Sequence, residues 1–472
     1  MNRRVFGALV AFWGCTFGVA GCTAGNAPPP RVILVSIDTL RADHLGLYGY
    51  ERDTSPFLDA FAREAVVFRG ALSQSAFTLV SHHSLFTARY PLRLIRETNG
   101  ADLAALASLE DPRGSLISTF AALRPAPLFE ALRRKGYTTA AFTDGVWMSA
   151  EMGFDRGFDF FNAEGGHLAW ILPRVFGWLD AHRSERFFLF IHTYDTHSPY
   201  HGSEPYNSRF CRDHSRHISL RMRCNQAQCG ATPLMKLQLT DADLRAVTDH
   251  YDGAIARVDA ALETLWRRLE RLQLLAESLI IVISDHGESL GEHDQVGHGG
   301  LHLEQLRVPL IVKFPDSWRI PATTIEDPVE LVDVMPTVYD ALGMELPEGV
   351  DGRSLIPGHA EGKGIRRYAV AQTAFEEGRD TITNPAKRAI LDPGHWFLIH
   401  DSRGASVTAF DLQHDERALQ GEASPPSGVV TELLAGLESR NSTGSAGAGE
   451  VPRLEMSEKL KAELRALGYG TE

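Results

Sequence analysis

The sequence predicts an α/β protein with a mostly parallel sheet that helices cover on both faces, followed by a small C-terminal α+β subdomain. Near-continuous apolar runs rich in β-branched residues occur at 31–38, 187–195 and 278–287. Such runs are typical of strands buried on both faces of a parallel sheet. Amphipathic helical patterns separate them, and this alternation favours βα units. From about residue 365 the strand-like pieces are short and adjacent, which favours a small antiparallel sheet.

The individual elements follow from periodicity and from the residues that begin or end them. A helix is predicted over 55–65, because Ser55 is a suitable N-cap and Pro56 suits the first helical position. In residues 128–143 a helical pattern ends at Gly136 and a strand pattern follows. Further elements of the large domain are a helix at 240–275, a strand at 306–315 and a helix at 331–343. The short strands are expected at 368–375, 388–392, 395–401 and 407–412.

Composition divides the chain into five predicted segments. Residues 439–452 are rich in Ser, Gly and Ala and predict a flexible linker, and Ser457 is expected to cap a terminal helix. The five segments are an export signal at 1–22, a tether at 23–31, a large α/β domain at 32–364, a small subdomain at 365–425, and a linker with a terminal helix at 426–472.

The N-terminal segment predicts export rather than a folded element. A basic stretch, MNRR, precedes an apolar run that is too short and too rich in glycine for a membrane span. The run ends in VAGC, which resembles the lipobox of bacterial lipoproteins, so Cys22 is the expected lipidation site. An ordinary secretory peptide cleaved nearby is the alternative. The lipobox predicts a periplasmic or cell-surface lipoprotein that is anchored to a membrane.

The charge balance argues against nucleic acid as a partner. The formal net charge at pH 7 is −13, and the sequence contains no long run of lysine or arginine. Proteins that bind nucleic acid present a basic face to the phosphate backbone. We therefore expect no nucleic-acid partner.

Three cysteines, Cys211, Cys224 and Cys229, lie in one polar stretch. In an exported protein two of them are expected to form a disulfide, whose pairing the sequence leaves open. A zinc knuckle that includes His214 or His217 is the alternative, but the spacing matches no common pattern.

Two acidic residues follow predicted buried strands. In open α/β sheets, ligands bind beyond the carboxyl ends of the strands. Asp38 ends the first apolar run, and Asp285 and His286 follow the apolar stretch IIVIS at 280–284. Carboxylates placed close together repel each other unless a cation lies between them. Either Asp alone would equally well cap a turn, but the set predicts one divalent metal ion. The histidine favours manganese or zinc, with calcium or magnesium as alternatives.

Thr78 then has a candidate role. A metal ion in contact with its Oγ would lower the pKa of the hydroxyl and make it a nucleophile. The following helix is predicted to begin near Ser81, so that its N-terminus offers an anion site. His82 and His83 at the helix start could bind an oxyanion or protonate a leaving group. Without the metal set, a threonine at this place would most often be a helix cap.

Two further histidine clusters follow predicted strand ends. Glycine in the second cluster would permit close backbone approach to a ligand. The first cluster offers His192, Asp195 and His197, and the second offers His293, His298 and His302.

Six stretches of the chain stand in a characteristic order. They are VSIDTLRADHLGLYGY, TLVSHHSLFTARYP, SDHGESLGEHDQVGHG, LRVPLIV, DVMPTVYDALG and GRSL. Together they resemble the sulfatase family of the alkaline phosphatase superfamily, over about residues 32–412. The resemblance implies an alkaline-phosphatase-like fold and a metal-centred hydrolase that forms a covalent intermediate.

The resemblance also implies site residues. Asp38, Asp285 and His286 fall on metal ligands, and Thr78 falls on the nucleophile, which also contacts the metal. His197 and His298 fall on positions that contact the substrate or the leaving group. His82 stands where the family has an arginine, and it is assigned with Arg41 to substrate binding.

The departures from the family pattern concern the nucleophile and the sulfate-binding cations. Threonine cannot be oxidised to the formylglycine that well-studied sulfatases form from Cys or Ser. Thr39 replaces the second Asp of the metal motif, and Val80 replaces a proline. Asp144 and Val146 stand where the family has Lys and His. Relatives with a direct threonine nucleophile transfer or hydrolyse phosphoryl groups and are normally tethered to a membrane.

The sequence therefore predicts an exported, lipid-anchored, metal-dependent enzyme that cleaves phosphate or, less favoured, sulfate esters through a Thr78 covalent intermediate. The expected substrate is a small-molecule, glycan or lipid-headgroup ester. Two alternatives stay open: a conventional sulfuric ester hydrolase, and a non-catalytic binder of anionic glycans or headgroups. A single metal is expected, because the stretch DTHSPYH matches the second set of the two-zinc relatives poorly.

Overall fold

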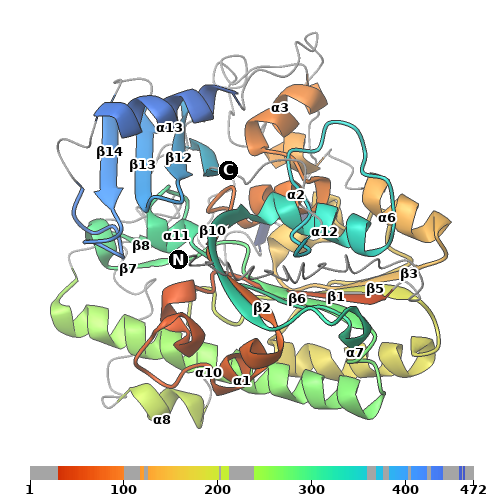
Figure 1. Ribbon diagram of the computed structural model, residues 1–472. Coiled ribbons are helices and arrows are strands. Elements are labelled where there is room, and N and C mark those ends of the chain that lie inside the picture. Colours follow the sequence, from red (N-terminus) through yellow and green to blue (C-terminus); the bar gives the residue numbers. More distant parts are fainter. Residues whose placement is uncertain are drawn as a thin grey trace, which may run out of the picture.

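The computed structural model describes most of the chain (Figure 1). The described residues are 30–99, 117–121, 126–200, 204–211, 239–358, 368–375, 382–401, 406–421, 427–439, 457–459 and 461–462. The predicted signal, Cys22 and most of the predicted tether lie outside them, as do Cys224 and Cys229, whereas Arg31, placed at the end of the tether, begins the first strand. Cys211 is described and buried. Within the described residues, no helix is both long enough and apolar enough to cross a membrane.

An eight-stranded sheet forms the centre of the large domain, as predicted. In spatial order its strands are β10 (Thr323–Glu330), β2 (Val66–Leu72), β9 (Leu310–Lys313), β6 (Ser278–Ile283), β1 (Arg31–Ile37), β5 (Phe187–Thr193), β3 (Thr138–Phe142) and β4 (Phe160–Asn162). All neighbouring strands pair in parallel except that β9 runs antiparallel to both β2 and β6. The sheet is therefore mostly parallel.

Helices cover both faces of this sheet, one group below it and one group above it in Figure 1. The lower group is α1 (Pro56–Phe61), α7 (Leu168–His182) and α10 (Asp241–Arg271), and the upper group is α2 (Thr78–Thr87), α3 (Pro91–Asn99), α6 (Ala126–Arg134) and α12 (Val334–Ala341). Alternate residues of β1 supply the two cores, because successive strand side chains point to opposite faces. Val32 and Leu34 pack in one core, and Ile33 and Val35 pack in the other.

Shorter elements connect these layers. A two-stranded ribbon of β7 (Ser289–Leu290) and β8 (Val296–Gly297) lies near α11 (Leu303–Leu306). The short helix α8 (Tyr206–Phe210) contacts α10. The single-turn 3₁₀ helices are η1 (Ala42–His44), η2 (Gly46–Tyr48), η3 (Ala62–Glu64), η4 (Val146–Met148), η5 (Ala150–Met152), η6 (Glu292–Asp294), η7 (Asp316–Trp318) and η8 (Leu331–Asp333).

The C-terminal subdomain is the predicted antiparallel sheet. Its strands, in order, are β11 (Ala369–Phe375), β12 (Ile382–Leu391), β13 (Trp396–Asp401) and β14 (Ser406–Asp411). One face packs on Leu303 and Leu306 of the large domain. The other face is covered by α13 (Ser427–Ser439), which presents Leu433 and Leu437 to it. This helix lies where the sequence suggests the start of the linker. The linker proper and most of the terminal helix lie outside the described residues.

Candidate active site

Three adjacent central strands bring the predicted acids to one edge of the sheet. In the register of β1, Ser36 lies beside His192 of β5 and Ile283 of β6. Asp38 follows β1 directly and Asp285 follows β6, so both carboxylates emerge at the same strand ends. Both side chains are fully buried.

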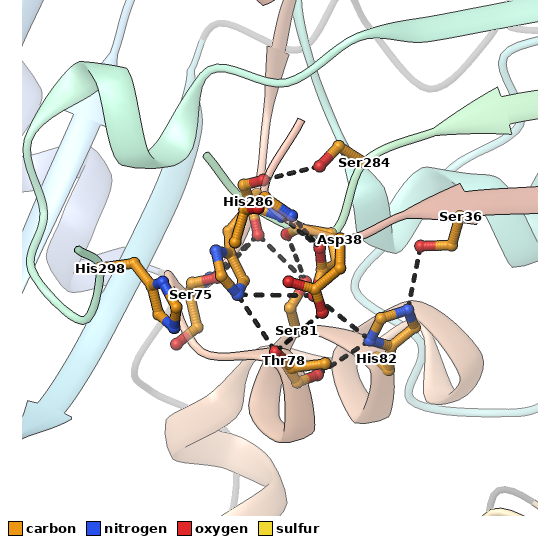
Figure 2. A network of polar contacts seen from close by, with 12 residues as sticks. Ser36, Asp38, Ser75, Thr78, Ser81, His82, Ser284, His286 and His298 are labelled. Atoms are coloured by element: carbon orange, nitrogen blue, oxygen red, sulfur yellow. Dashed lines mark hydrogen bonds and ion pairs between the residues drawn. The ribbon is translucent and has the colours of Figure 1, made fainter. Parts of the chain in front are cut away.

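Thr78 lies against this pair at the beginning of α2 (Figure 2). Its Oγ1 donates to Asp38 Oδ2 at 3.1 Å and lies 3.2 Å from His286 Nε2. The helix begins at Thr78 rather than near Ser81, and its N-cap is Phe77, in extended conformation and without a side-chain cap. The Thr78 hydroxyl therefore faces the acids and does not cap the helix.

Backbone contacts fix the orientation of Asp285 and His286. Oδ1 of Asp285 accepts from the backbone N–H of Thr39 at 3.3 Å and of His286 at 3.0 Å. The Ser81 hydroxyl donates to the Asp285 backbone carbonyl at 2.7 Å. His286 Nδ1 lies 2.9 Å from the Gly287 carbonyl, an acceptor, so Nδ1 carries the proton and Nε2 faces Thr78.

The two buried carboxylates repel each other, so a nearby positive charge would stabilise them. Burial raises the pKa of Asp38, and the neighbouring Asp285 carboxylate raises it further. Burial also opposes the ionisation of Asp285, but the facing histidines, His286 foremost, lower its pKa. Two like charges in a dry site are stable together only when a cation or a proton lies between them.

The residues present fit a divalent cation. Asp38 Oδ1 and Asp285 Oδ2 are buried and accept no hydrogen bond from the described residues. Ligand atoms of Asp38, Asp285 and His286 all lie within 4.8 Å of one another. These three side chains, with the Thr78 hydroxyl, would hold the ion. Two carboxylates and an imidazole suit zinc or manganese better than calcium.

His82 lies one helical turn after Thr78, on the opposite side of Asp38 from His298 in Figure 2. Its Nδ1 is 2.9 Å from the Thr78 carbonyl oxygen, and its Nε2 is 3.0 Å from Ser36 Oγ. The side chain is fully buried, and this burial lowers its pKa to about 3. His82 is therefore a neutral group behind the carboxylates and not an exposed anion-binding residue.

The predicted histidines His197 and His298 lie together on the other side. Their ring centroids are 5.2 Å apart, and the ring of His298 lies 4.5 Å from that of His286. Burial lowers the pKa of each to about 4. His197 comes from the loop after β5 and His298 from the loop after β8, so the structure brings these distant segments together beside Thr78 and His286.

Glu288 is a site residue that was not predicted from the sequence, and His192 was predicted only as a member of a histidine cluster. Glu288 Oε1 lies 2.9 Å from His298 Nδ1 and so orients that ring. His192 Nε2 lies 3.4 Å from Asp38 Oδ2. A signal for each exists in the sequence, since Glu288 follows the Asp285-His286 pair by two residues and His192 lies near the end of a buried strand.

Arg41 departs from its predicted role in substrate binding. Its Nε and Nη2 donate to Asp43 at 2.9 and 2.7 Å, and its Nη1 donates to Glu292 at 2.9 Å and to the Glu288 carbonyl at 3.0 Å. Four hydrogen bonds to protein groups occupy the guanidinium, which is fully buried. We therefore interpret Arg41 as a structural residue.

Other residues of the predicted histidine clusters also have structural contacts. Asp195 pairs with Arg257 at 2.8 Å and accepts from the backbone N–H of Leu168 at the start of α7. His293 and His302 stack on each other with ring centroids 3.9 Å apart. These contacts give Asp195, His293 and His302 a structural role, so none of the three needs a role in the chemistry.

Asp144 stands where the family has a lysine. Its carboxylate accepts from the backbone N–H groups of Gly145 at 2.8 Å and Gly166 at 3.0 Å, so it closes a turn. Arg41 and Arg257, which contact the site loops, are both paired with carboxylates.

The family of the chain follows from comparison with known proteins. The sequence model of the family described as Sulfatase matches residues 30–344. The multifunctional alkaline phosphatase superfamily protein PehA of Trinickia caryophylli is 31% identical over 209 residues, which cover 40% of this chain and 40% of that protein. Human arylsulfatase K is 30% identical over 191 residues, which cover 39% of this chain and 35% of that enzyme. The chain thus matches about two fifths of the length of these relatives.

Solved structures share the fold. The phosphonate monoester hydrolase of Agrobacterium radiobacter superposes with a TM-score of 0.66 at 20% identity, covering 91% of this chain and 98% of that one. A protein in complex with its substrate D-glucosamine-2-N,6-O-disulfate superposes with a TM-score of 0.61 at 18% identity, covering 87% and 97%. Because the family's sequence model spans more than half of the chain, the protein belongs to the sulfatase family.

Proposed function

We propose that the protein is a metal-dependent hydrolase or transferase that cleaves phosphoric, phosphonic or sulfuric esters through a covalent intermediate on Thr78, with phosphoryl esters favoured. The position of the Thr78 hydroxyl carries the proposal. The hydroxyl lies within hydrogen-bonding distance of Asp38 and His286, although the helix that it begins has no need of it as a cap. A threonine held in this way is oriented as a nucleophile rather than as a structural group.

The chain's own residues supply a balanced first step. Thr78 Oγ attacks phosphorus, so that an O–P bond forms as the bond from phosphorus to the leaving oxygen breaks. Asp38 Oδ2, which accepts the hydrogen bond of the hydroxyl, is positioned to take its proton. A divalent cation held by Asp38, Asp285 and His286 would supply Lewis-acid stabilisation of the developing charge.

His298 is the better placed of the two histidines to protonate the leaving oxygen. Its ring is neutral in the free protein, but the negative charge of a bound ester favours protonation at Nε2, so that the ring would enter the step as an imidazolium and leave it neutral. Its Nδ1 is hydrogen-bonded to Glu288, whose pKa burial raises, and this arrangement aims Nε2 away from the carboxylate. His197 lies beside it with a similar environment. In the second step water or an acceptor alcohol attacks phosphorus, the Oγ–P bond breaks, and Thr78 regains a proton.

The charges around the site favour singly charged esters. The nearby arginines are paired with carboxylates, and burial keeps His197 and His298 neutral near pH 7. A phosphate diester, a phosphonate monoester or a sulfate ester carries one negative charge, whereas a phosphate monoester carries about two near neutral pH. We therefore expect the singly charged esters to react faster.

The test is turnover of nitrophenyl sulfate, nitrophenyl phosphate and bis-nitrophenyl phosphate by the metal-loaded protein. We expect the diester to be the best substrate and Thr78→Ala to lose at least about 10³-fold in kcat/KM. Thr87→Ala is the matched control, because Thr87 ends the same helix and donates to the His83 carbonyl. Wild-type rates in Thr78→Ala would contradict the nucleophile.

The substrate pattern separates the remaining alternatives. Turnover of the sulfate alone would identify a conventional sulfuric ester hydrolase that uses an unmodified threonine. Silence on all three compounds, with metal bound, would favour the non-catalytic binder of anionic glycans or headgroups.

We also propose that Cys22 anchors the exported protein to a membrane. The proposal rests on the basic stretch, the apolar run and the VAGC sequence. Incorporation of labelled fatty acid that disappears in Cys22→Ser would support it. Release of soluble, unlabelled wild-type protein would instead indicate an ordinary secretory peptide.

A further inference from the structure

Two buried histidines lie on the side of the carboxylates opposite His298. His192 is the last but one residue of β5 and His82 belongs to α2, and both side chains are fully buried. Their ring centroids are 4.9 Å apart, and the two ring planes are nearly perpendicular. Ligand atoms of His82, His192 and Asp285 all lie within 4.8 Å of one another. The proposed reaction uses Asp285 of this group but neither of the two histidines.

The tautomer of His192 points to a cation. Its Nδ1 lies 3.0 Å from the backbone carbonyl of Asp144, which can only accept, so Nδ1 carries a proton. In the neutral ring the lone pair is then on Nε2, which lies 3.4 Å from Asp38 Oδ2 and makes no hydrogen bond to the described residues. Two electron-rich atoms this close in a dry site require a positive charge between them.

His192 is held in the same way as His286 on the other side. In both residues a backbone carbonyl fixes Nδ1 as a donor and leaves Nε2 facing the acids, at the Asp144 carbonyl for one and the Gly287 carbonyl for the other. Such hydrogen bonds orient histidines that ligate metals in proteins. The carboxylate pair therefore lies between two imidazole rings, His192 and His286, whose Nε2 atoms both face it.

His82 completes the group. Its Nδ1 lies 3.6 Å from Asp285 Oδ2 and 2.9 Å from the Thr78 carbonyl oxygen, and its Nε2 lies 3.0 Å from Ser36 Oγ. Because the Thr78 carbonyl only accepts, Nδ1 carries the proton in this arrangement and Nε2 accepts from the Ser36 hydroxyl. The serine hydroxyl can also accept, so the proton can move to Nε2 when a cation binds, and Nδ1 would then face Asp285 Oδ2 as a third ligand.

We propose that His192, His82 and Asp285 form a second divalent-cation site, deeper than the site at Thr78 and joined to it through the shared Asp285 carboxylate. Two imidazoles and a carboxylate suit zinc or manganese. The second cation would bring to the acids a positive charge that no described arginine or lysine supplies. The alternative is a proton on His192 Nε2, paired with Asp38, beside a single metal ion.

Metal stoichiometry separates these two states. Purified protein would be stripped with a chelator, reloaded with Mn²⁺ and desalted, and bound manganese would be measured by mass spectrometry. Manganese is preferred to zinc because Cys224 and Cys229 could hold zinc through thiolates. We expect two ions per wild-type chain and one in His192→Ala, with His192→Gln as a second variant that keeps more of the buried volume.

His83→Gln is the matched control. His83 is the next residue on the same helix and is equally buried, but its ring packs against Phe154 at 4.6 Å and Phe120 at 5.8 Å. This variant should keep both ions. One ion per wild-type chain at saturation, or two ions in both His192 variants, would overturn the second site.

A spectroscopic readout works even where the variants fail to fold. Two Mn²⁺ ions that share a carboxylate lie about 3.5–4 Å apart in two-metal sites, which is close enough for exchange coupling. We therefore expect the electron paramagnetic resonance spectrum of the loaded wild type to show a coupled pair, whereas isolated six-line Mn²⁺ signals would contradict it. Neither measurement needs turnover, so a failure of the proposed ester chemistry would leave the second site testable.

Discussion

Two groups of charged side chains lie near the carboxyl ends of the central strands, and they are built in opposite ways. The arginine cluster consists of Arg41, Asp43, Glu292 and Arg417. The carboxylate pair consists of Asp38 and Asp285. The arginine cluster contains a cation for every acid, whereas the carboxylate pair sets two acids against each other.

The arginine cluster is compensated within the protein. Arg41 lies 2.7 Å from Asp43 and 2.9 Å from Glu292, and Arg417 lies 2.6 Å from Glu292. Although burial opposes ionisation, the Arg41 guanidinium lowers the pKa of Glu292 to about 2. Every charge here has its partner, so the cluster needs no ligand.

The carboxylate pair lacks such compensation. The groups that face it are histidines, and two of its oxygens accept no hydrogen bond from the described residues. The comparison teaches that burial of charge alone does not mark a functional site. What marks it is a buried charge whose partner must come from outside the chain.

The largest effect is expected from removing one charge of the pair. Asp285→Asn keeps the volume but loses a ligand, so metal content should fall and kcat/KM should drop by at least about 10³-fold. In chelator, however, the variant should melt at a higher temperature than the metal-free wild type, because the repulsion from Asp38 is gone. A melting temperature of the metal-free variant below that of the metal-free wild type would show that Asp38 and Asp285 do not repel each other in the absence of metal.

The arginine cluster should respond in the opposite sense. Arg41→Met leaves Asp43 and Glu292 without their main partner, so the free energy of unfolding should fall by about 3–5 kcal/mol while metal content per folded chain is unchanged. Arg417→Met is the control, because its side chain is half exposed and an exposed pair contributes about 1 kcal/mol or less. Denaturant unfolding measures both. Equal effects of the two variants would show that burial of Arg41 is unimportant.

The difference between these clusters also explains what the sequence could predict. The strands β1 and β6 are continuous apolar runs, and an acid directly after such a strand must emerge at the ligand-binding edge. That local rule found Asp38, Asp285 and His286. The antiparallel direction of β9 depends on packing between β2 and β6, which no local pattern reports.

Arg41 and His192 show the same limit within the site. Arg41 lies in a motif beside Asp38, but its partner Glu292 is far away in the sequence, and only the folded chain brings the two together. His192 lies near the end of β5, beside Ser36 of β1. Whether its ring faces Asp38 depends on which face of the sheet it occupies, which the sequence does not report. Helix α13 lies in the segment predicted to contain the linker, and its packing on β12 is a tertiary effect.

A smaller effect is expected from titrating the arginine cluster. Glu292 has a folded-state pKa of about 2 against an ordinary value of 4.5. Because the folded-state pKa is depressed, its contribution to stability is fully present above pH 4.5 and is lost as the pH falls toward 2. Glu292→Gln should therefore flatten the loss of stability over that range, measured by denaturant unfolding at several pH values. An unchanged pH profile would contradict the ion pair with Arg41.

The smallest effect is expected from an ion pair that is neither buried nor near the site. On α10, Arg267 lies 2.6 Å from Glu263 one turn earlier, with 68% and 44% of the side chains exposed. Water already solvates both charges, so Arg267→Ala should cost only about 0.3–0.5 kcal/mol and leave turnover unchanged. The pair is as short as the contacts of Arg41, which isolates burial as the variable. A cost near that of Arg41→Met would mean that contact distance, not desolvation, sets the energy of ion pairs in this fold.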